Sequence, residues 1–399
     1  MTLSHPAALF IPWNEDLAEY NLGPTHPLAP IRVQLAMQLA KELGVLDDLE
    51  LTSDFPLATD EQLLRVHTPE LIAAVKQASH DPHFFSAEHG LGTSDDPVFA
   101  NMHRAAARVA GATTAAAVAV WTGEAEHAVN LAGGLHHGHS NSAAGFCVYN
   151  DIAVAIAELL DRGAKRIAYI DIDAHHGDGV QEIFWNDPRV LTISIHESPR
   201  TLFPGTGEPS EIGGPDALGS AVNIALPAGT GDQGFLRAFS AVVPQVINAF
   251  VPEIIICQNG ADSHAEDPLT HLTLSVDGQL SAYQAVHRLA HAHGGKLVSV
   301  GGGGYDLFNA VPRSWAHLIA VMAGKPVVKS TPVPDSFIEY VRALTGSVIT
   351  PVMTDGAEPW AKPIEQGFNP TNPVDEAIMQ TRLAVFPYYE IDPEVNSWF

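Results

Sequence analysis

The stretch Arg166-Ile-Ala-Tyr-Ile-Asp-Ile-Asp-Ala-His-His-Gly-Asp-Gly179 joins an apolar run to a burst of acids, histidines and glycines. The apolar half is typical of a buried strand. Because side chains alternate along a strand, Asp171, Asp173 and His175 would share one face if the strand continued. Three such groups are costly to bury unless a cation or a hydrogen-bond network satisfies them. The stretch therefore predicts a metal-dependent catalytic site at the carboxyl end of a strand.

The composition indicates a folded, acidic protein. Its 399 residues are 46% hydrophobic and 17% charged, so the chain can bury a sizeable core. The net charge of −26 argues against binding to a nucleic-acid backbone and favours cationic ligands, although solubility alone also explains it. The two cysteines, Cys147 and Cys257, cannot make a disulfide framework or a Cys-x-x-Cys metal pair. The N-terminus lacks a signal-peptide pattern, and residues 105–120 are too short and too weakly apolar to cross a membrane. We therefore expect a cytoplasmic protein with no membrane partner.

Strand-like and helix-like segments alternate along the chain, which predicts an α/β architecture with a mainly parallel central sheet. Apolar runs suited to strands occupy residues 7–11, 127–132, 167–172, 190–195, 221–226, 253–257 and 296–300. Helical patterns occupy residues 31–43, 97–121, 151–162, 233–250, 275–293 and 332–344.

The texture of the sequence changes near its C-terminus. No linker divides the first 325 residues, whereas prolines are frequent after residue 350 and the chain ends in aromatic residues, namely Phe386, Tyr388, Tyr389, Trp398 and Phe399. We expect a catalytic domain over residues 1–325. Residues 326–399 would form a helix and an aromatic-rich extension that packs on the body or on a partner subunit.

Four predicted strands are each followed by polar groups set among glycines. The segments are Gly133-Gly-Leu-His-His-Gly-His139, Asp173-Ala-His-His-Gly-Asp178, Gln258-Asn-Gly-Ala-Asp262 and Gly301-Gly-Gly-Gly-Tyr305. Open parallel sheets bind ligands outside the carboxyl ends of their strands, and glycines there let the backbone approach a ligand closely. Four such strand ends together predict a single composite site.

The acids and histidines of these segments suit a catalytic metal. Asp173, His175 and Asp262 would give three ligands and leave a coordination position open, as expected of a catalytic site. Mixed imidazole and carboxylate ligands suit Zn²⁺, and also Fe²⁺, Co²⁺ or Mn²⁺. Any one of these residues taken alone could instead cap a turn or belong to a satisfied polar pair.

The remaining polar groups suit acid–base work. His136 and His137 have no partners nearby in the sequence, while Asp171 and Asp178 remain once the ligands are assigned. Two His–Asp pairs beside a metal-activated water would supply a general base and a general acid. The Tyr305 hydroxyl could donate to a carbonyl oxygen as that oxygen becomes anionic. The alternative for Tyr305 is an aromatic plug in a glycine-rich turn.

Taken together, these motifs resemble the zinc-dependent histone deacetylase family of the arginase/deacetylase superfamily, including its bacterial acetoin-utilisation-type members. The resemblance covers about residues 21–324. Its motifs include Gly134-Leu-His-His-Gly138, Gly145-Phe-Cys-Val-Tyr-Asn-Asp151, Asp171-Ile-Asp-Ala-His-His-Gly-Asp-Gly179, Phe203-Pro-Gly-Thr-Gly207, Gly260-Ala-Asp262 and Gly301-Gly-Gly-Gly-Tyr305. It implies a single-domain arginase-like fold, so residues 1–325 would be a deacetylase domain that hydrolyses an amide, a C–N bond outside the peptide backbone.

Carried over from the family, Asp173, His175 and Asp262 would bind Zn²⁺, with Fe²⁺ as an alternative. His137 would be the general base and then the acid, with Asp178 behind it. His136 and Asp171 would orient groups and stabilise charge, and Tyr305 would complete the oxyanion contact.

The resemblance also implies a substrate tunnel and a second ion. Gly145, Phe146, Phe203 and Leu269 would line a narrow tunnel for an aliphatic chain. Asp95, or its neighbour Asp96, would sit on the rim. A structural K⁺ would lie near Asp171, Asp173, His175 and Ser194.

The function implied is removal of acetyl, or another short acyl, groups from lysine side chains by metal-activated water attack. The substrate would be an acetyl-lysine protein or, as the runner-up, an acetylated polyamine or other small cationic amide. Leu135 before the histidine pair favours the first, since the acetylpolyamine branch usually has Pro-Gly-His-His there. A two-metal ureohydrolase needs a second cluster of acids, which Gln258-Asn-Gly-Ala-Asp262 does not supply. A catalytically silent acyl-lysine binding module should have lost a ligand, a tandem histidine or the tyrosine, and none is lost. The sequence leaves a homo-oligomer open.

Overall fold

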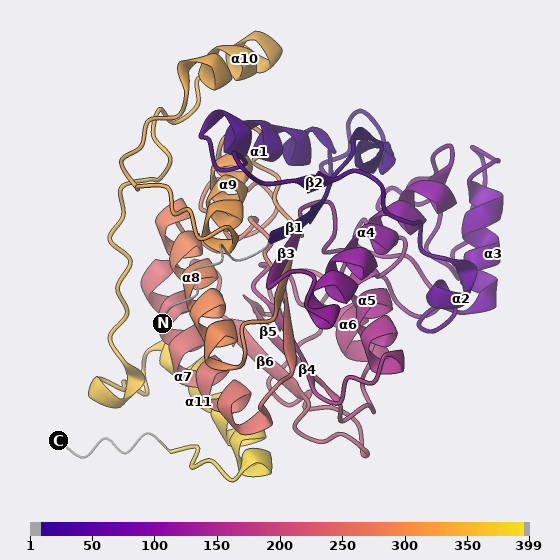
Figure 1. Ribbon diagram of the computed structural model, residues 1–399. Coiled ribbons are helices and arrows are strands. Elements are labelled where there is room, and N and C mark those ends of the chain that lie inside the picture. The colour runs from indigo at the N-terminus through magenta and orange to yellow at the C-terminus, as the bar shows by residue number, and fades with distance from the viewer. Residues whose placement is uncertain (1–8, 395–399) are drawn as a thin grey trace.

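The computed structural model describes residues 9–394, in which one eight-stranded sheet runs through the middle of the molecule (Figure 1). Its strands lie in the order β2-β1-β3-β8-β7-β4-β5-β6, and every strand pair is parallel. The strands are β1 (Leu9–Pro12), β2 (Leu51–Thr52), β3 (His127–Asn130), β4 (Ile167–Asp171), β5 (Val190–Glu197), β6 (Ala221–Leu226), β7 (Ile254–Gln258) and β8 (Leu297–Val300). The predicted α/β class and parallel sheet are therefore confirmed. Residues 7 and 8 of the first predicted strand lie outside the described residues.

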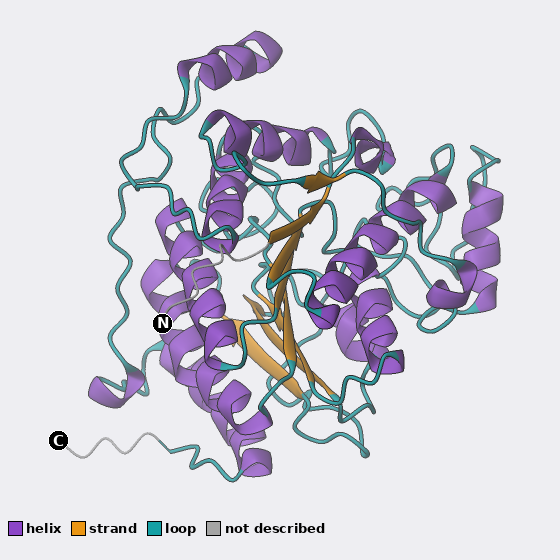
Figure 2. Cartoon of the chain, viewed as in Figure 1, coloured by secondary structure: helices purple, strands orange, loops and turns teal. Residues whose placement is uncertain are grey.

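Helices cover both faces of the sheet, which appears nearly edge-on between them in Figure 2. One group of helices comprises α2 (Asp60–Leu63), α3 (Pro69–Ala78), α4 (Met102–Thr122), α5 (Asp151–Asp161) and α6 (Asp178–Ile183). The other comprises α1 (Ile31–Glu42), α7 (Asp232–Phe250), α8 (Val276–Ala292), α9 (Ala310–Met322), α10 (Asp335–Thr345) and α11 (Pro373–Val385). Three short 3₁₀ turns complete the described elements, at η1 (Glu15–Glu19), η2 (Ile364–Gln366) and η3 (Phe386–Tyr389).

Alternation along the buried strands gives the sheet two apolar faces. In β4, Ile167 and Tyr169 belong to the core that includes residues of α4 and α5, whereas Ala168 and Ile170 belong to the core that includes residues of α7 and α8. All of these side chains are buried. Because both faces of the strand are buried, its sequence is continuously apolar and does not alternate between apolar and polar residues. Each face of the sheet therefore has its own hydrophobic core. Polar groups at the ends of the strands do not interrupt either core.

The C-terminal segment packs on the far edge of the sheet. Helix α11 contacts β6 and α7, and Thr381 Oγ1 donates to the carbonyl oxygen of Asn223 over 2.6 Å. Phe386 is fully buried, and Tyr389 Oη donates to the carbonyl oxygen of Gly219 over 2.9 Å. Helix α10 projects beside α1 (Figure 1). Trp398 and Phe399, which the sequence analysis includes in the aromatic tail, lie outside the described residues.

Several predicted boundaries were wrong, for local reasons. The helix predicted from residue 97 begins at Met102, because Asn101 is in the left-handed region, with φ of 61°. Helices α2, α3, α6, α9 and α11 and strand β2 were not predicted. Helix α11 begins at Pro373. Proline is well tolerated in the first turn of a helix, so this residue begins the helix and does not interrupt it.

Candidate active site

Four neighbouring strands, β3, β8, β7 and β4, carry the four glycine-rich segments at their carboxyl ends. Because these strands are adjacent and parallel, all four segments emerge at the same edge of the sheet. Segments as far apart in the sequence as residues 133 and 305 therefore meet at one place.

Asp173, His175 and Asp262 form a compact buried cluster at this edge. One ligand atom from each lies within 4.8 Å of the others. His175 Nδ1 is 3.1 Å from Asp173 Oδ1 and 2.8 Å from Asp262 Oδ2. Tetrahedral ligands held at zinc's usual distances are separated by roughly 3.3 Å, so the spacing suits a divalent metal.

The strand does not continue to His175 and ends one residue short of the predicted limit at residue 172. Strand β4 ends at Asp171, and the chain then turns. The Asp173 N–H donates to Asp171 Oδ1 over 3.1 Å, and the His175 N–H donates to Asp173 Oδ1 over 2.9 Å. Side-chain oxygens thus replace the strand partners of these backbone groups. As a result Asp171 is separated from the metal cluster and faces His136.

Neighbouring groups hold the two carboxylates in place. Asp173 Oδ2 accepts from Gln258 Nε2 and from the Gly303 N–H, both over 2.7 Å. Asp262 Oδ1 accepts from the Ala174 N–H over 2.9 Å. A Cβ placed on Gly303 would lie 2.2 Å from Asp262 Oδ2, so only glycine allows this approach.

The electrostatics of the cluster favour a cation. Burial disfavours a charged His175, but the adjacent carboxylates outweigh burial and raise its pKa to about 10. Burial, together with the charge of Asp173, raises the pKa of Asp262 to about 8. Two buried carboxylates this close repel each other, and a bound cation would relieve that repulsion.

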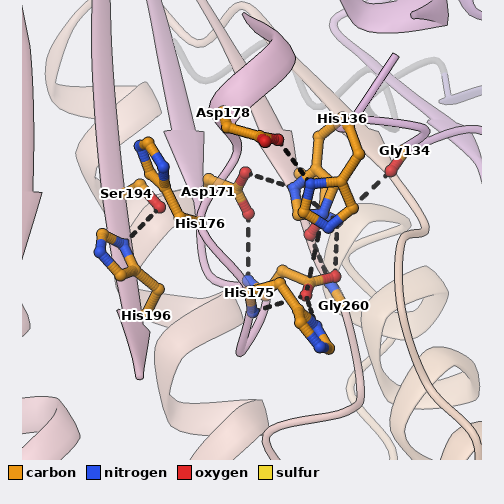
Figure 3. Close-up of polar contacts among 12 residues, drawn as sticks. Gly134, His136, Asp171, His175, His176, Asp178, Ser194, His196 and Gly260 are labelled. Atoms are coloured by element: carbon orange, nitrogen blue, oxygen red, sulfur yellow. Dashed lines mark hydrogen bonds and ion pairs between the residues drawn. The ribbon is translucent and has the colours of Figure 1, made fainter. Parts of the chain in front are cut away.

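His136 is paired with Asp171 (Figure 3). Its Nδ1 lies 2.7 Å from Asp171 Oδ2, which also accepts from the Tyr169 hydroxyl over 2.6 Å. Burial lowers the pKa of His136, but the charges of Asp171 and Asp173 raise it, and the result is about 9. This histidine is therefore suited to remain protonated.

His137 is paired with Asp178, and its environment is the opposite of that of His136. Its Nδ1 lies 2.6 Å from Asp178 Oδ1. Burial and the positive charge of His136, whose ring centre is 4.0 Å away, lower the pKa of His137 to about 4. His139 Nε2 also lies 3.4 Å from Asp178 Oδ2. His137 is therefore neutral at physiological pH and can accept a proton at Nε2.

Tyr305 follows the four glycines and is fixed through its backbone. Its N–H donates to Asp267 Oδ2 over 2.8 Å. Burial and the charges of Asp262 and Asp173 raise the pKa of Tyr305 well above its ordinary value, so the hydroxyl keeps its proton. Arg32 Nη1 donates to the carbonyl oxygens of Gly302 and Gly304 and so anchors the glycine run from behind.

Aromatic rings flank these polar groups. Phe203, which is 47% exposed, packs edge-on against His137 with ring centres 5.0 Å apart. Phe146 packs edge-on against Tyr305 at 5.9 Å. Leu269 is also partly exposed, and its N–H donates to Asp267 Oδ1 over 2.9 Å.

Phe146 has a φ of 70°, an unusual conformation for a bulky residue. The Gly145 N–H donates to Asp95 Oδ2 over 2.9 Å, and Tyr20 Oη donates to the Phe146 carbonyl oxygen over 2.7 Å. These contacts hold the strained turn, and such strain is common at functional sites. Asp95 is half-buried, whereas Asp96 is 1% exposed and burial raises its pKa to about 8.

Ser194 lies directly opposite Asp171 in the pairing of β5 with β4. Its hydroxyl is 2.8 Å from His196 Nδ1 (Figure 3). The pairing thus places two residues with oxygen-bearing side chains, Asp171 and Ser194, opposite each other on neighbouring strands.

Sequence reasoning gave no role to Gln258, Asp267, Tyr169 or Arg32. Gln258 is the first residue of the segment Gln258-Asn-Gly-Ala-Asp262. It is also the last residue of a strand that ends at the site, and this position could have identified it as a functional residue. Arg32 has no such signal, because its contact with Gly302 spans 270 residues.

Comparisons with known proteins agree on one family. Residues 26–322 match the model of the histone deacetylase domain. The acetoin utilization protein AcuC of Bacillus subtilis is 46% identical over 308 residues, which cover 76% of this chain and 79% of the relative. AcuC of Staphylococcus aureus (strain MRSA252) is 35% identical over 318 residues, covering 79% and 82%. The crystal structure of an HDAC homologue from Aquifex aeolicus superposes with a TM-score of 0.82 at 30% identity, covering 94% of this chain and 99% of that one. An HDAC homologue complexed with SAHA gives 0.82 at 29% identity, covering 94% and 100%.

Proposed function

The chain belongs to the histone deacetylase family, and from this premise we propose that it is a metal-dependent amidohydrolase that removes acetyl, or another short acyl, groups from lysine side chains. One observation carries the proposal. Two His–Asp pairs with opposite protonation tendencies stand beside a buried Asp–His–Asp cluster at a single sheet edge. The family match and the AcuC relatives support the deacetylase class.

Asp173, His175 and Asp262 would hold the metal, which we propose is Zn²⁺, with Fe²⁺ as the alternative. Two carboxylates and one imidazole, all buried, form a donor set that suits either ion. Bound there, the ion would supply Lewis-acid polarisation of the amide carbonyl and of a water molecule. Gln258 and Gly303 orient the Asp173 carboxylate by donating to its other oxygen.

His137 would act as the general base. Asp178 accepts its Nδ1–H, which fixes the tautomer and leaves the lone pair on Nε2. His137 is neutral at physiological pH, so it can take a proton from the attacking water. His136, which is held protonated by Asp171, would stabilise the negative charge that develops.

Tyr305 would donate its hydroxyl hydrogen to the carbonyl oxygen as that oxygen gains charge. Its raised pKa keeps the proton in place, and the Asp267 contact fixes the backbone from which the ring extends. When the C–N bond breaks, the amine leaves with the proton that His137 took from water. The protons then balance, because water has delivered a hydroxyl to the acyl carbon and a hydrogen to the amine.

Gly145, Phe146, Phe203 and Leu269 would form the tunnel through which the lysine stem passes. Phe203 and Phe146 pack against His137 and Tyr305 respectively, so they stand at the two groups that would act on the amide. A Cβ on Gly145 would lie 2.4 Å from Cδ2 of His137, which explains the need for glycine at that wall. Asp95 would lie at the rim of the tunnel, where its carboxylate accepts from the Gly145 N–H.

We also propose a structural K⁺ between β4 and β5, held by Asp171, Asp173, His175 and Ser194 through side-chain and backbone oxygens. The pairing of Asp171 with Ser194 supports it. We further propose that residues 1–325 are the deacetylase domain and that residues 326–399 are an extension that supports it.

The test is acetate release by the protein loaded with one equivalent of Zn²⁺. We expect turnover of an acetyl-lysine peptide and loss of activity when the metal is chelated. N-acetylspermidine is the comparison substrate. A higher kcat/KM on N-acetylspermidine than on the peptide would favour the small-amine alternative, whereas inactivity on both would contradict the amidohydrolase proposal.

A further inference from the structure

Three histidines lie close together near the amino ends of β3 and β8, at the opposite end of the strands from the active site. His127 is the first residue of β3, and His287 and His291 come from the last two turns of α8. One ring nitrogen from each lies within 4.8 Å of the others. The ring centres are 4.5–5.0 Å apart. The active-site mechanism uses none of these residues.

The order of the elements in the fold brings the three histidines together. His287 and His291 are four residues apart, so they lie on the same face of α8, one turn apart. The chain leaves α8 at Ala292 and enters β8 at Leu297, which pairs with His127 in β3. The short connection therefore brings the end of the helix against the start of β3.

The tautomer of the His127 ring suits a metal ligand. Its Nδ1 lies 3.1 Å from the Met322 carbonyl oxygen, which can only accept, so Nδ1 carries the hydrogen. The lone pair is thereby fixed on Nε2. The side chain is 1% exposed, and its Nε2 has no hydrogen-bond partner among residues 9–394. A buried acceptor left without a partner costs free energy, and a bound cation would remove that cost.

The other two rings complete a ligand set. Nε2 of His287 and Nε2 of His291 are 3.3 Å apart. That separation equals the roughly 3.3 Å expected of two tetrahedral ligands on one zinc ion. Glu126 Oε1 lies 3.7 Å from His291 Nδ1 and offers a carboxylate nearby.

We propose that His127, His287 and His291 form a second metal site that binds a divalent ion preferred by imidazole, such as Zn²⁺, Ni²⁺ or Cu²⁺. The ion would tie the end of α8 to the start of β3 and so stabilise the fold away from the chemistry. The proposal does not depend on the deacetylase mechanism. The competing interpretation is a proton shared by His287 and His291 with no affinity for metal.

The experiment is equilibrium dialysis of the full chain against Zn²⁺, followed by metal analysis. Wild-type protein should bind two Zn²⁺ per chain, and the double variant His287→Ala/His291→Ala should bind one. His293→Ala is the matched control, because this histidine follows the same helix but contacts Asn248 instead, and it should bind two. Deacetylase activity of the zinc-loaded double variant should equal that of the wild type.

Two further readouts make the test decisive. Zn²⁺ added beyond the first equivalent should raise the melting temperature of the wild type and leave that of the double variant unchanged. If the double variant fails to fold, the single variant His291→Ala, which removes an exposed ring, should bind the second Zn²⁺ more than about tenfold more weakly. Equal binding of Zn²⁺ by the wild type and by the double variant would overturn the proposal.

Discussion

Nδ1 of His137 lies 2.6 Å from Oδ1 of Asp178, so the carboxylate fixes the tautomer of the ring proposed to move the proton. The neighbouring pair, His136 and Asp171, has nearly the same separation of 2.7 Å. The two histidines nevertheless differ in protonation, because the carboxylates of Asp171 and Asp173 surround His136, while His137 faces the positive charge of His136. Similar contacts therefore give one cationic ring and one neutral ring.

Replacing His137 with Ala should lower kcat by about 10²–10⁴-fold, the usual contribution of a general base. The zinc content should stay at the wild-type value, because the ligand cluster does not include His137. Steady-state kinetics with metal analysis of the same sample measures both quantities. His80→Ala, at an exposed position, is the control and should behave as wild type. A His137→Ala variant that keeps near-normal kcat would rule out this base.

Tyr305→Phe removes one hydroxyl and should lower kcat by about 10²–10³-fold with little change in KM. The reason is that the proposed hydrogen bond strengthens only as the carbonyl oxygen gains charge. Tyr340→Phe, on the exposed helix α10, should leave kcat unchanged. An increase in KM at constant kcat would instead show that the hydroxyl binds the ground state.

Gly303→Ala should weaken zinc binding. The added Cβ would lie 2.2 Å from Asp262 Oδ2 and 2.9 Å from Asp173 Oδ2, so at least one ligand must move. We expect a zinc Kd that is higher by about 10–100-fold, measured by competition with a chelator. Gly163→Ala is the control. Its φ of 99° strains an added side chain, but no atom of residues 9–394 lies within 4 Å of the added Cβ, so stability should fall while zinc affinity stays the same.

His139 should make stability depend on pH. Asp178 and Glu182, which both contact the ring, raise its pKa from 6.5 to about 10. Because the folded-state pKa is the higher one, the stabilisation is complete below pH 6.5 and is lost as the pH rises toward 10. The free energy of unfolding of wild type should exceed that of His139→Gln by about 1–2 kcal/mol at pH 6, a value reduced by the 24% exposure of the ring. Urea titrations at pH 6 and 9.5 measure the difference, and an equal difference at both values would contradict this account.

The strands could be predicted because their residues are apolar on both faces. Residues 167–171 and 254–258 are buried throughout, and such runs are visible without any knowledge of their neighbours. The four strand ends could likewise be placed at one edge, because parallel strands share a direction. The strand order could not be predicted, since it depends on crossovers that no local pattern records.

The site could be predicted only as far as its residues belong to short motifs. Asp173, His175 and Asp262 stand in such motifs, whereas the supporting contacts from Arg32 and Asp267 join distant segments. The turn after Asp171 could not be predicted, because the side-chain oxygens of Asp171 and Asp173, and not a neighbouring strand, accept from its N–H groups. The histidine cluster also needs the structure, since residue 127 meets residues 287 and 291 only through the pairing of β3 with β8.

The central claim is that this chain hydrolyses acetyl-lysine with a metal held by Asp173, His175 and Asp262. The most direct measurement is acetate release from an acetyl-lysine peptide by wild type and Asp262→Asn, with the zinc content of each sample determined in parallel. We expect turnover by the zinc-loaded wild type, and in Asp262→Asn a loss of turnover together with weakened zinc binding at this cluster. Absence of acetate release by wild-type protein that demonstrably holds zinc at this cluster would contradict the account.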